Sequence, residues 1–300
     1  PPPPPPPPPR HGVRRQRQMC IRDRRRAGED FTAGDPLVRS GQLIQANQIM
    51  GLAATGVGEL EVRTPPRVAA ITTGNELTTA TAELQPGKIH DSNGPYLEAA
   101  IASMGARSSG VFRSRDSADE LIALIESVQD DADVILTTGG VSAGRMDFVP
   151  AALEQLGADI LFHRVAIRPG KPILFARLPS GTLVFGLPGN PIAVAVGLRF
   201  FVTPALRKMQ GLPAETYLHA SLKETVGKKP GLRFFAKALA TTDTSGQILV
   251  KVLPGQESFK ISPLMSANCW LIASEEQAEL TAGTAVAIAP LYPGTFRATN

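Results

Sequence analysis

The sequence predicts an α/β protein, with a three-layer αβα domain on a mostly parallel sheet followed by a small all-β domain. Between residues 67 and 212, short apolar runs alternate with segments whose apolar residues recur at helical spacing. That order is typical of a parallel sheet covered by helices on both faces. From residue 213 to 300, helical periodicity is weak, and short alternating runs stand between Gly, Pro, Ser and Thr. This second texture is typical of small β domains.

Four apolar runs and four amphipathic segments define the expected elements of the α/β domain. The strands are expected at 68–73, 133–136, 173–176 and 183–185. The helices are expected at 93–104, from 117 onward, at 148–156 and at 191–209. In the β domain, runs at 248–253 and 285–288 alternate with a period of two, which predicts half-buried strands.

The region before the α/β domain divides into two segments. Residues 1–27 begin with nine prolines and continue with an Arg-rich stretch without periodicity. Polyproline forms an extended rod with no core to join, so we expect a disordered extension or one foreign to the protein. A basic nucleic-acid arm or a proline-rich peptide ligand is the alternative. Residues 28–66 predict one short helix, around Ile49 and Leu52, and a linker that ends at Pro66.

Charge and composition restrict the class of function. The chain has 300 residues and a formal net charge of +4. Residues 1–30 hold eight Arg against three acids, whereas residues 31–300 hold 23 basic and 24 acidic residues. The body is therefore nearly neutral, which does not favour a nucleic-acid partner.

Cysteine usage and hydropathy point to the cytoplasm. Cys20 and Cys269 lie in unrelated contexts and show no spacing for zinc or for a disulfide framework. No apolar stretch reaches the ~20 residues that span a bilayer, and no secretory signal pattern opens the sequence. We expect a cytoplasmic protein with no membrane partner.

Three loops follow predicted strands and contain candidate binding residues. They are TTGNEL (72–77), TTGGVSAGRMD (137–147) and GLPGNP (186–191). Ligands of open α/β sheets bind at the carboxyl ends of the strands. In the second loop, Gly139 and Gly140 permit close approach of the backbone, while Ser142 and free N–H groups can hold an anion. Plain loop geometry is the alternative for each loop taken alone.

Acidic residues punctuate the same edge of the predicted sheet, at Glu76, Asp91, Asp116 and Asp147. Carboxylates beside a phosphate-binding loop are how proteins hold Mg²⁺, which prefers oxygen ligands and substrate phosphates. For Glu76 or Asp147 taken alone, the alternative is a helix N-terminal charge or a surface acid; for Asp116, which precedes a predicted helix, it is an N-cap.

A cationic run comes just before the strand that leads to the third loop. Arg164, Arg168 and Lys171 lie in this run, and Pro169 and Pro172 restrict its conformations. Such a cluster suits an oxyanion, and a solvated charged turn is the alternative. The motifs GxGxxG and GxxxxGK[ST] are absent from the sequence, which disfavours hydride-transfer and P-loop chemistry.

Five segments together resemble the molybdopterin molybdotransferase family, the MoeA and gephyrin E-domain proteins. They are TGNEL (73–77), GKIHDSN (87–93), TTGGVSAGRMDF (137–148), AIRPGKP (166–172) and GLPGNP (186–191). A sixth, FKISPLMSANCWLIASE (259–275), resembles the family's C-terminal β domain. The resemblance covers roughly residues 28–295, and it implies an α/β domain of the molybdopterin-binding type.

The resemblance implies an enzyme that inserts molybdate into adenylylated molybdopterin with Mg²⁺ and releases AMP. It implies a homodimer, with other cofactor-biosynthesis enzymes as further partners. The acidic positions matched are Glu76, Asp116 and Asp147, as catalytic residues and Mg²⁺ ligands. The matched substrate-binding positions are Gly139, Gly140, Ser142, Arg164, Arg168, Lys171, Pro188, Asn190 and Pro191.

Two departures from the family and three alternatives qualify this expectation. The family has TGDEL where this chain has Asn75, a change that weakens metal binding or alters a cap. The family also carries a substantial region before residue 28, so residues 28–66 read as the remnant of an upstream domain in an N-terminally truncated chain. The alternatives are a molybdopterin adenylyltransferase, a non-catalytic binding or scaffold module, and an inactive fragment. The GLPGNP helix and the β domain favour the molybdotransferase.

Overall fold

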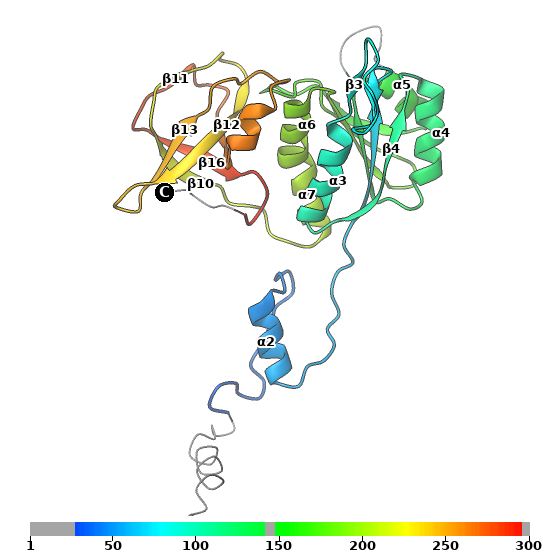
Figure 1. Cartoon of the computed structure of the whole chain (residues 1–300). Helices are drawn as coiled ribbons and strands as arrows, with labels where there is room; N and C mark the ends of the chain where they lie inside the picture. Colours follow the sequence, from blue (N-terminus) through cyan, green and yellow to red (C-terminus); the bar gives the residue numbers. More distant parts are fainter. Residues whose placement is uncertain (1–27, 142–147, 296–300) are drawn as a thin grey trace, which may run out of the picture. The chain divides into compact units, whose positions relative to one another are not determined.

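The structure is a computed structural model of the whole chain, and it describes residues 28–141 and 148–295 (Figure 1). Two compact units divide the chain, residues 1–62 and residues 63–300. In the described part of the first unit, α2 (Ala46–Ala54) is the one helix. Its Leu52 is buried, whereas Ile49 and Met50 are 58% and 74% exposed.

A six-stranded mixed sheet forms the centre of the α/β part. Its strands are β1 (Arg67–Thr73), β4 (Arg107–Ser114), β5 (Val134–Thr138), β6 (Asp159–His163), β8 (Leu174–Arg177) and β9 (Leu183–Leu187). The order is β4-β1-β5-β9-β8-β6. The pairs β1–β4, β1–β5 and β5–β9 are parallel, while β8 is antiparallel to both β9 and β6. The carboxyl ends of β1, β4, β5, β9 and β6 therefore lie at one edge.

Helices cover both faces of this sheet, as the sequence predicts. They are α3 (Asn93–Ser103), α4 (Ala118–Val128), α5 (Phe148–Gln155), α6 (Pro191–Gly197) and α7 (Thr203–Met209), with a π-helical turn η1 (Leu198–Val202) between the last two. Val68 and Ala70 of β1 pack in the cluster that holds α3, α6 and α7. Their neighbours Ala69 and Ile71 pack in the cluster of α4 and α5. This alternation is the period of two of a strand buried on both faces.

The second sheet contains the C-terminal strands. They are β10 (Leu218–Leu222), β12 (Arg233–Thr242), β13 (Ile248–Val252), β14 (Cys269–Ala273) and β16 (Ala285–Pro290), joined by β7 (Ile167–Arg168). The order is β13-β10-β16-β14-β12-β7. Two small ribbons complete the strands: β2 (Leu77–Thr78) with β3 (Ile89–His90), and β11 (Val226–Gly227) with β15 (Glu279–Leu280). One short helix, α8 (Ser262–Ser266), interrupts the expected all-β part.

The α/β part and the β part share one apolar core. The ring of Phe200, in the π-helical turn, stacks on Phe235 of β12 at 4.1 Å and meets Trp270 of β14 edge-on at 6.4 Å. Phe235 and Trp270 are 5% and 2% exposed. Residues 63–300 form one compact unit, so the structure does not divide the α/β part from the β part. The domain boundary between residues 212 and 213 therefore stays a prediction.

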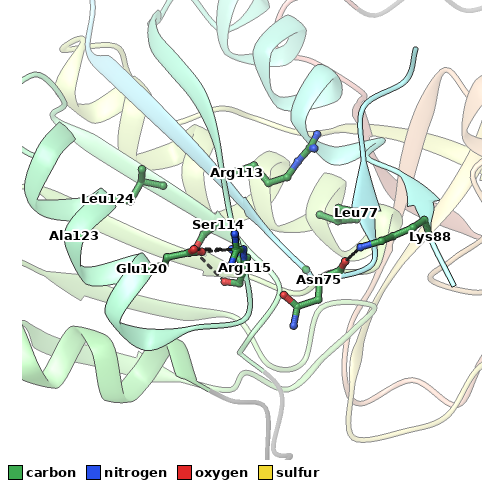
Figure 2. A pocket seen from close by; sticks show the side chains of 10 residues that line it. Asn75, Leu77, Lys88, Arg113, Ser114, Arg115, Glu120, Ala123 and Leu124 are labelled. Carbon is green, nitrogen blue, oxygen red and sulfur yellow. Dashed lines mark hydrogen bonds and ion pairs between the residues drawn. The ribbon is translucent and has the colours of Figure 1, made fainter. Parts of the chain in front are cut away.

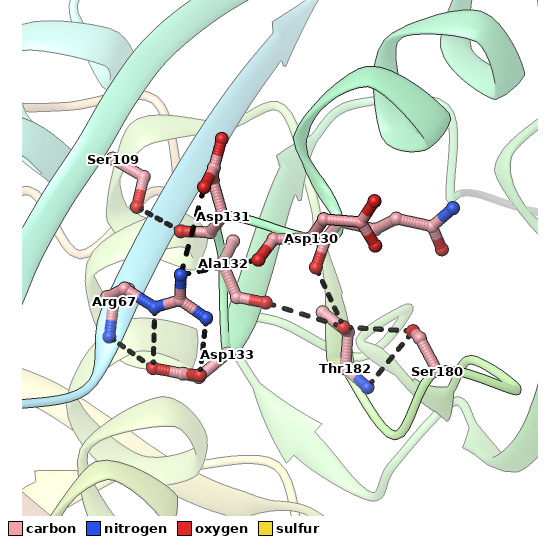
Figure 3. Close-up of polar contacts among 9 residues, drawn as sticks. Arg67, Ser109, Asp130, Asp131, Ala132, Asp133, Ser180 and Thr182 are labelled. Atoms are coloured by element: carbon pink, nitrogen blue, oxygen red, sulfur yellow. Dashed lines mark hydrogen bonds and ion pairs between the residues drawn. The ribbon is translucent and has the colours of Figure 1, made fainter.

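A half-exposed ion pair between Arg67 and Asp133 lies at the amino edge of the first sheet (Figure 3). The backbone N–H of Arg67 donates to Oδ2 of Asp133 at 2.7 Å, and its guanidinium donates to Oδ1 at 3.1 Å. This contact joins the start of β1 to the residue before β5. Among the helices of residues 28–141 and 148–295, none is long and apolar enough to cross a membrane.

Candidate functional site

The loops singled out by sequence meet at the carboxyl edge of the first sheet. The hydroxyl of Thr73 donates to the carbonyl of Thr138 at 2.9 Å, which joins the ends of β1 and β5. The N–H of Gly139 donates to the carbonyl of Leu187 at 2.9 Å, which joins β5 to β9. The Nε2 atom of His163 lies 3.1 Å from the carbonyl of Val141, which brings the end of β6 to the same edge.

The loops after β1 and β4 carry the two described acids of the predicted site. The backbone N–H of Asn75 donates to Oδ2 of Asp116 at 3.1 Å, and the N–H of Asp116 donates to Oδ1 of Asn75 at 3.4 Å. The carboxylate of Glu76 folds over Gly74, where a Cβ atom would lie 2.8 Å from Oε2. Glu76 is exposed and Asp116 half-buried. Both carboxylates thus stand on adjacent loops.

The predicted acid at Asp91 has a different role. It is buried, and its carboxylate accepts hydrogen bonds from the Thr72 hydroxyl at 2.8 Å and from the backbone N–H groups of Asn93 and Gly94 at 3.0 Å. The carboxylate thus supplies an acceptor for two backbone N–H groups at the start of α3, which have no acceptor within the helix. Asp91 therefore accepts the first backbone N–H groups of α3 and acts as a helix-capping residue.

The glycine loop after β5 approaches its neighbours closely. Gly139 has φ +95°, and a Cβ there would lie 2.6 Å from Oγ1 of Thr73. Gly140 has φ +63°, and a Cβ there would lie 2.8 Å from the ring of Phe148. Beneath this loop, the buried hydroxyls of Thr137 and Thr138 have no hydrogen-bond partner among the described residues. The predicted site residues Ser142 and Asp147 lie outside the described residues.

The third loop is held from two sides. Pro188 is buried and Pro191 opens α6. The side chain of Asn93 donates to the carbonyl of Gly189 at 2.9 Å. The other contacts come from Ser258 of the β part. The Ser258 hydroxyl accepts a hydrogen bond from the side-chain amide of Asn190 at 3.0 Å. The Ser258 carbonyl accepts the backbone N–H of Ile192 at 3.0 Å.

Sequence reasoning missed Ser258 and the lysine that holds its loop. Lys237 of β12 is fully buried, and its ammonium donates to the carbonyls of Glu257 at 3.2 Å and Lys260 at 3.0 Å. Burial lowers the pKa of Lys237. No motif marks either residue, because the contacts that define them join segments far apart in the chain. Asn93 could have been predicted from the sequence, because it is the last residue of the GKIHDSN segment.

The predicted cationic run lies on the short loop between β6 and β8. Arg164 adopts φ +70°, and the loop closes through the N–H of Val165, which donates to the carbonyl of Lys171 at 2.8 Å. Arg164 and Lys171 are exposed. The guanidinium of Arg168 instead lies 5.8 Å from the ring centroid of Phe234 in β12. Arg168 therefore makes a cation–π contact with the β part.

A cleft of about 730 Å³ opens beside the two acidic loops (Figure 2). It is lined by the loop after β1, the end of β4 and the first turns of α4. Lys88, Arg113 and Arg115 supply its cationic groups and Glu120 its one carboxylate. No group of three or more potential metal ligands occurs in the part of the chain that the structure describes.

The fold is an open α/β domain whose loops meet at the carboxyl edge of its sheet, joined to a β domain. Residues 69–208 match the family described as "Probable molybdopterin binding domain", and residues 219–291 match "MoeA C-terminal region (domain IV)". The chain belongs to the MoeA family of molybdopterin biosynthesis proteins.

Curated relatives and solved structures agree with this placement. The molybdopterin molybdenumtransferase of Synechococcus elongatus is 36% identical over 270 residues, which are 89% of this chain and 66% of that protein. The molybdopterin molybdenumtransferase of Staphylococcus aureus (strain MSSA476) is 34% identical over 82% of this chain and 58% of that protein. The molybdopterin biosynthesis MoeA protein of Pyrococcus horikosii superposes with a TM-score of 0.74 at 29% identity, covering 88% and 64% of the two chains. The chain thus spans about 58–66% of the length of these curated relatives.

Proposed function

We propose that this protein is a molybdopterin molybdotransferase that inserts molybdate into adenylylated molybdopterin and releases AMP. The observation that carries the proposal is the convergence of acidic, glycine-rich and cationic loops at one edge of a molybdopterin-binding sheet. The relatives that share 34–36% identity are named molybdopterin molybdenumtransferases. The substrates are molybdate and the adenylylated pterin.

The acids at this edge are the proposed holders of Mg²⁺. Glu76 and Asp116 stand on adjacent loops, and both present carboxylate oxygens, the donors that Mg²⁺ prefers. Mg²⁺ is commonly bound by one or two carboxylates together with substrate phosphates and water, so these two residues fit the ion without a full protein cage. Asp147 is the third proposed ligand, by its sequence motif. When bound, the ion supplies charge neutralisation at the phosphoanhydride.

The cations and glycines are the proposed substrate-binding groups. Arg164 and Lys171 are exposed on one short loop at the end of β6 and suit an oxyanion such as molybdate. Gly139 and Gly140 let the backbone of their loop approach Thr73 and Phe148 closely, and they are proposed as substrate-binding positions by their sequence motif. The orphaned hydroxyls of Thr137 and Thr138 are potential donors to a polar group bound there. Pro188, Asn190 and Pro191 fix the third loop at the start of α6.

One observation favours this function over pterin adenylylation. The β part reaches the third loop through Ser258, which contacts Asn190 and Ile192. Contacts between the α/β part and the third loop's partner in the β part fit a molybdotransferase, whose chain contains both parts. An adenylyltransferase would need only the α/β domain. We further propose a cytoplasmic homodimer.

The proposal is tested with the full chain, adenylylated molybdopterin, molybdate and Mg²⁺. We expect AMP release and a product that activates a molybdenum-dependent apoenzyme. Glu76→Gln and Asp147→Asn should each lower the rate by about 100-fold or more, because charge neutralisation at the anhydride is removed. Arg177→Gln, an exposed arginine paired with Asp159 at 3.4 Å on β8, is the matched control and should retain full activity.

Three outcomes would contradict the assignment. Undiminished activity in Asp147→Asn would remove that residue from the site. Adenylylation of the pterin that depends on ATP would support an adenylyltransferase instead. Tight pterin binding with no turnover would support a non-catalytic binding module.

A further inference from the structure

His163 makes a polar contact to which the proposed function gives no role. It is the last residue of β6 and is half-buried, opposite Leu174 of the antiparallel strand β8. Its Nε2 atom lies 3.1 Å from the carbonyl oxygen of Val141. Because a carbonyl oxygen only accepts hydrogen bonds, Nε2 carries a proton and donates it to this bond.

The carbonyl that His163 contacts belongs to the glycine loop after β5. The N–H of Gly139 donates to the carbonyl of Leu187 in β9 at 2.9 Å, and the carbonyl of Gly140 accepts the N–H of Val149 in α5 at 3.2 Å. The backbone of this loop is thus held from β9, from α5 and, through the imidazole, from β6. Of these three hydrogen bonds, the one from His163 is donated by a side chain, so a substitution at residue 163 removes it alone.

The glycine loop needs such anchors because its backbone has unusual freedom. Gly139 and Gly140 follow one another with φ of +95° and +63°, and residues without a Cβ reach many backbone conformations at little cost. The direction of the chain after them is therefore set by hydrogen bonds to neighbouring elements rather than by local sterics. Val141 follows directly, with its side chain buried, and the bond from His163 orients its carbonyl.

The imidazole is a well-fixed donor. The next residue, Arg164, has φ +70° and donates its backbone N–H to the carbonyl of Ile173 at 2.9 Å, which ties the end of β6 to the start of β8. A neutral imidazole protonated at Nε2 and the imidazolium cation both carry the N–H that Val141 accepts. The contact therefore persists in both protonation states of His163, and its Nε2 is not free to act as a general base.

We propose that His163 is a positioning residue of the candidate site, which fixes the glycine loop through the carbonyl of Val141 so that the loop receives the pterin substrate. His163 acts through Val141 rather than by contact with the substrate. That a pterin binds along this loop rests on the proposed function, whereas the anchoring of the loop rests on its hydrogen bonds. Because Arg164 is the next residue, an effect on the cationic loop is the rival explanation.

The anchor is tested by amide hydrogen exchange of the full chain without substrates. His163→Leu removes the donor, whereas His163→Gln supplies an amide N–H in place of Nε2. We expect the N–H groups of Gly139 and Val149 to exchange about 10-fold faster in His163→Leu, because one hydrogen bond of the loop is lost, and at close to the unaltered rate in His163→Gln. His219→Leu, at an exposed position of β10 in the β part, is the matched control and should leave both rates unchanged.

The positioning role is tested by steady-state kinetics with adenylylated molybdopterin, molybdate and Mg²⁺. In His163→Leu, KM for the adenylylated pterin should rise about 10-fold, because the backbone that receives it is displaced, while KM for molybdate stays unchanged. His163→Gln should restore the pterin KM to within about threefold, and His219→Leu should match the unaltered chain. A purely structural contact would lower the melting temperature and leave both KM values unchanged.

The two measurements separate the anchor from the proposed function. Unchanged exchange of Gly139 and Val149 in His163→Leu would overturn the anchor, and faster exchange with an unchanged pterin KM would overturn the positioning role. A rise in the molybdate KM alone would assign the effect to Arg164 instead. If the unaltered chain has no transferase activity, the proposed function fails, and exchange that still depends on residue 163 would support the anchor by itself. His163→Asn, whose side chain is shorter, replaces His163→Leu if that variant does not fold.

Discussion

At the scale of single residues, the acids of this sheet edge differ in what their oxygens contact. Asp91 is buried and accepts three hydrogen bonds, so it holds the start of α3. Asp116 accepts one, from the N–H of Asn75. The sequence shows four acids at similar places and cannot separate them, because burial depends on how the strands pair. The amide oxygen of Asn75 accepts the backbone N–H of Asp116 at 3.4 Å, a hydrogen bond between the two loops that needs no charge at residue 75.

Asp133 provides a prediction about acid stability. Burial alone would raise the pKa of Asp133, but hydrogen bonds from the Arg67 side chain and backbone outweigh it, and the pKa is lowered. The stabilisation is therefore complete above the pKa of an unfolded Asp, ~3.9, and is lost as the pH falls through the lower folded value. Asp133→Asn should cost about 1 kcal/mol at pH 7 and flatten the acid limb below about pH 4. Urea unfolding across pH measures both effects.

Asp159→Asn is the matched control for this experiment. Asp159 pairs with Arg177 at the surface, with the two side chains 61% and 57% exposed. Exposed pairs contribute little, so its unfolding free energy should follow that of the unaltered chain at every pH. A similar acid limb in Asp133→Asn and the unaltered chain would show that Asp133 does not link stability to pH.

At the scale of elements, the sequence predicts the inner strands well and the outer ones poorly. β1, β5 and β9 are buried on both faces and read as continuous apolar runs. β4 lies at the sheet edge, where RSSGVFRS is mostly exposed or half-buried, so its sequence has no strand pattern. The helix expected over 191–209 contains a π-helical turn at Leu198–Val202. The carbonyl of Leu198 accepts both the backbone N–H of Thr203, an i→i−5 bond of the π-helical turn, and the Thr203 hydroxyl, at 2.8 Å.

The glycine loop after β5 gives a prediction at this scale. Gly139→Ala should destabilise the protein by about 2–4 kcal/mol, because it adds a Cβ at positive φ that would lie 2.6 Å from Oγ1 of Thr73 and 3.0 Å from its carbonyl oxygen. Gly181→Ala is the control: its φ is +90°, but nothing lies within 4 Å of the added Cβ. Denaturant unfolding of both separates the backbone strain from the clash. Equal losses in the two variants would mean that the approach of Gly139 to Thr73 is not tight.

At the scale of the whole molecule, the candidate site depends on contacts between parts that the sequence presents as separate domains. Ser258 holds Asn190 across 68 positions, and Lys237 holds the loop of Ser258. Local periodicity and turn chemistry predict each part, but they contain no information on how the parts pack. A buried lysine in a β-strand is read from sequence as a surface charge, because its partners are backbone carbonyls about 20 residues away.

The shared core predicts that the α/β part and the β part unfold together. Phe235 is 5% exposed and stacks on Phe200, which belongs to the α/β part. Phe235→Ala should therefore cost about 3–5 kcal/mol and lower the melting temperature of one transition common to both parts. Phe259→Ala, on the same β part but 63% exposed, should change stability by less than about 0.5 kcal/mol. Calorimetry checks this prediction. If the unaltered chain shows two transitions and Phe235→Ala moves only one of them, the apolar contact between the two parts does not couple their folding.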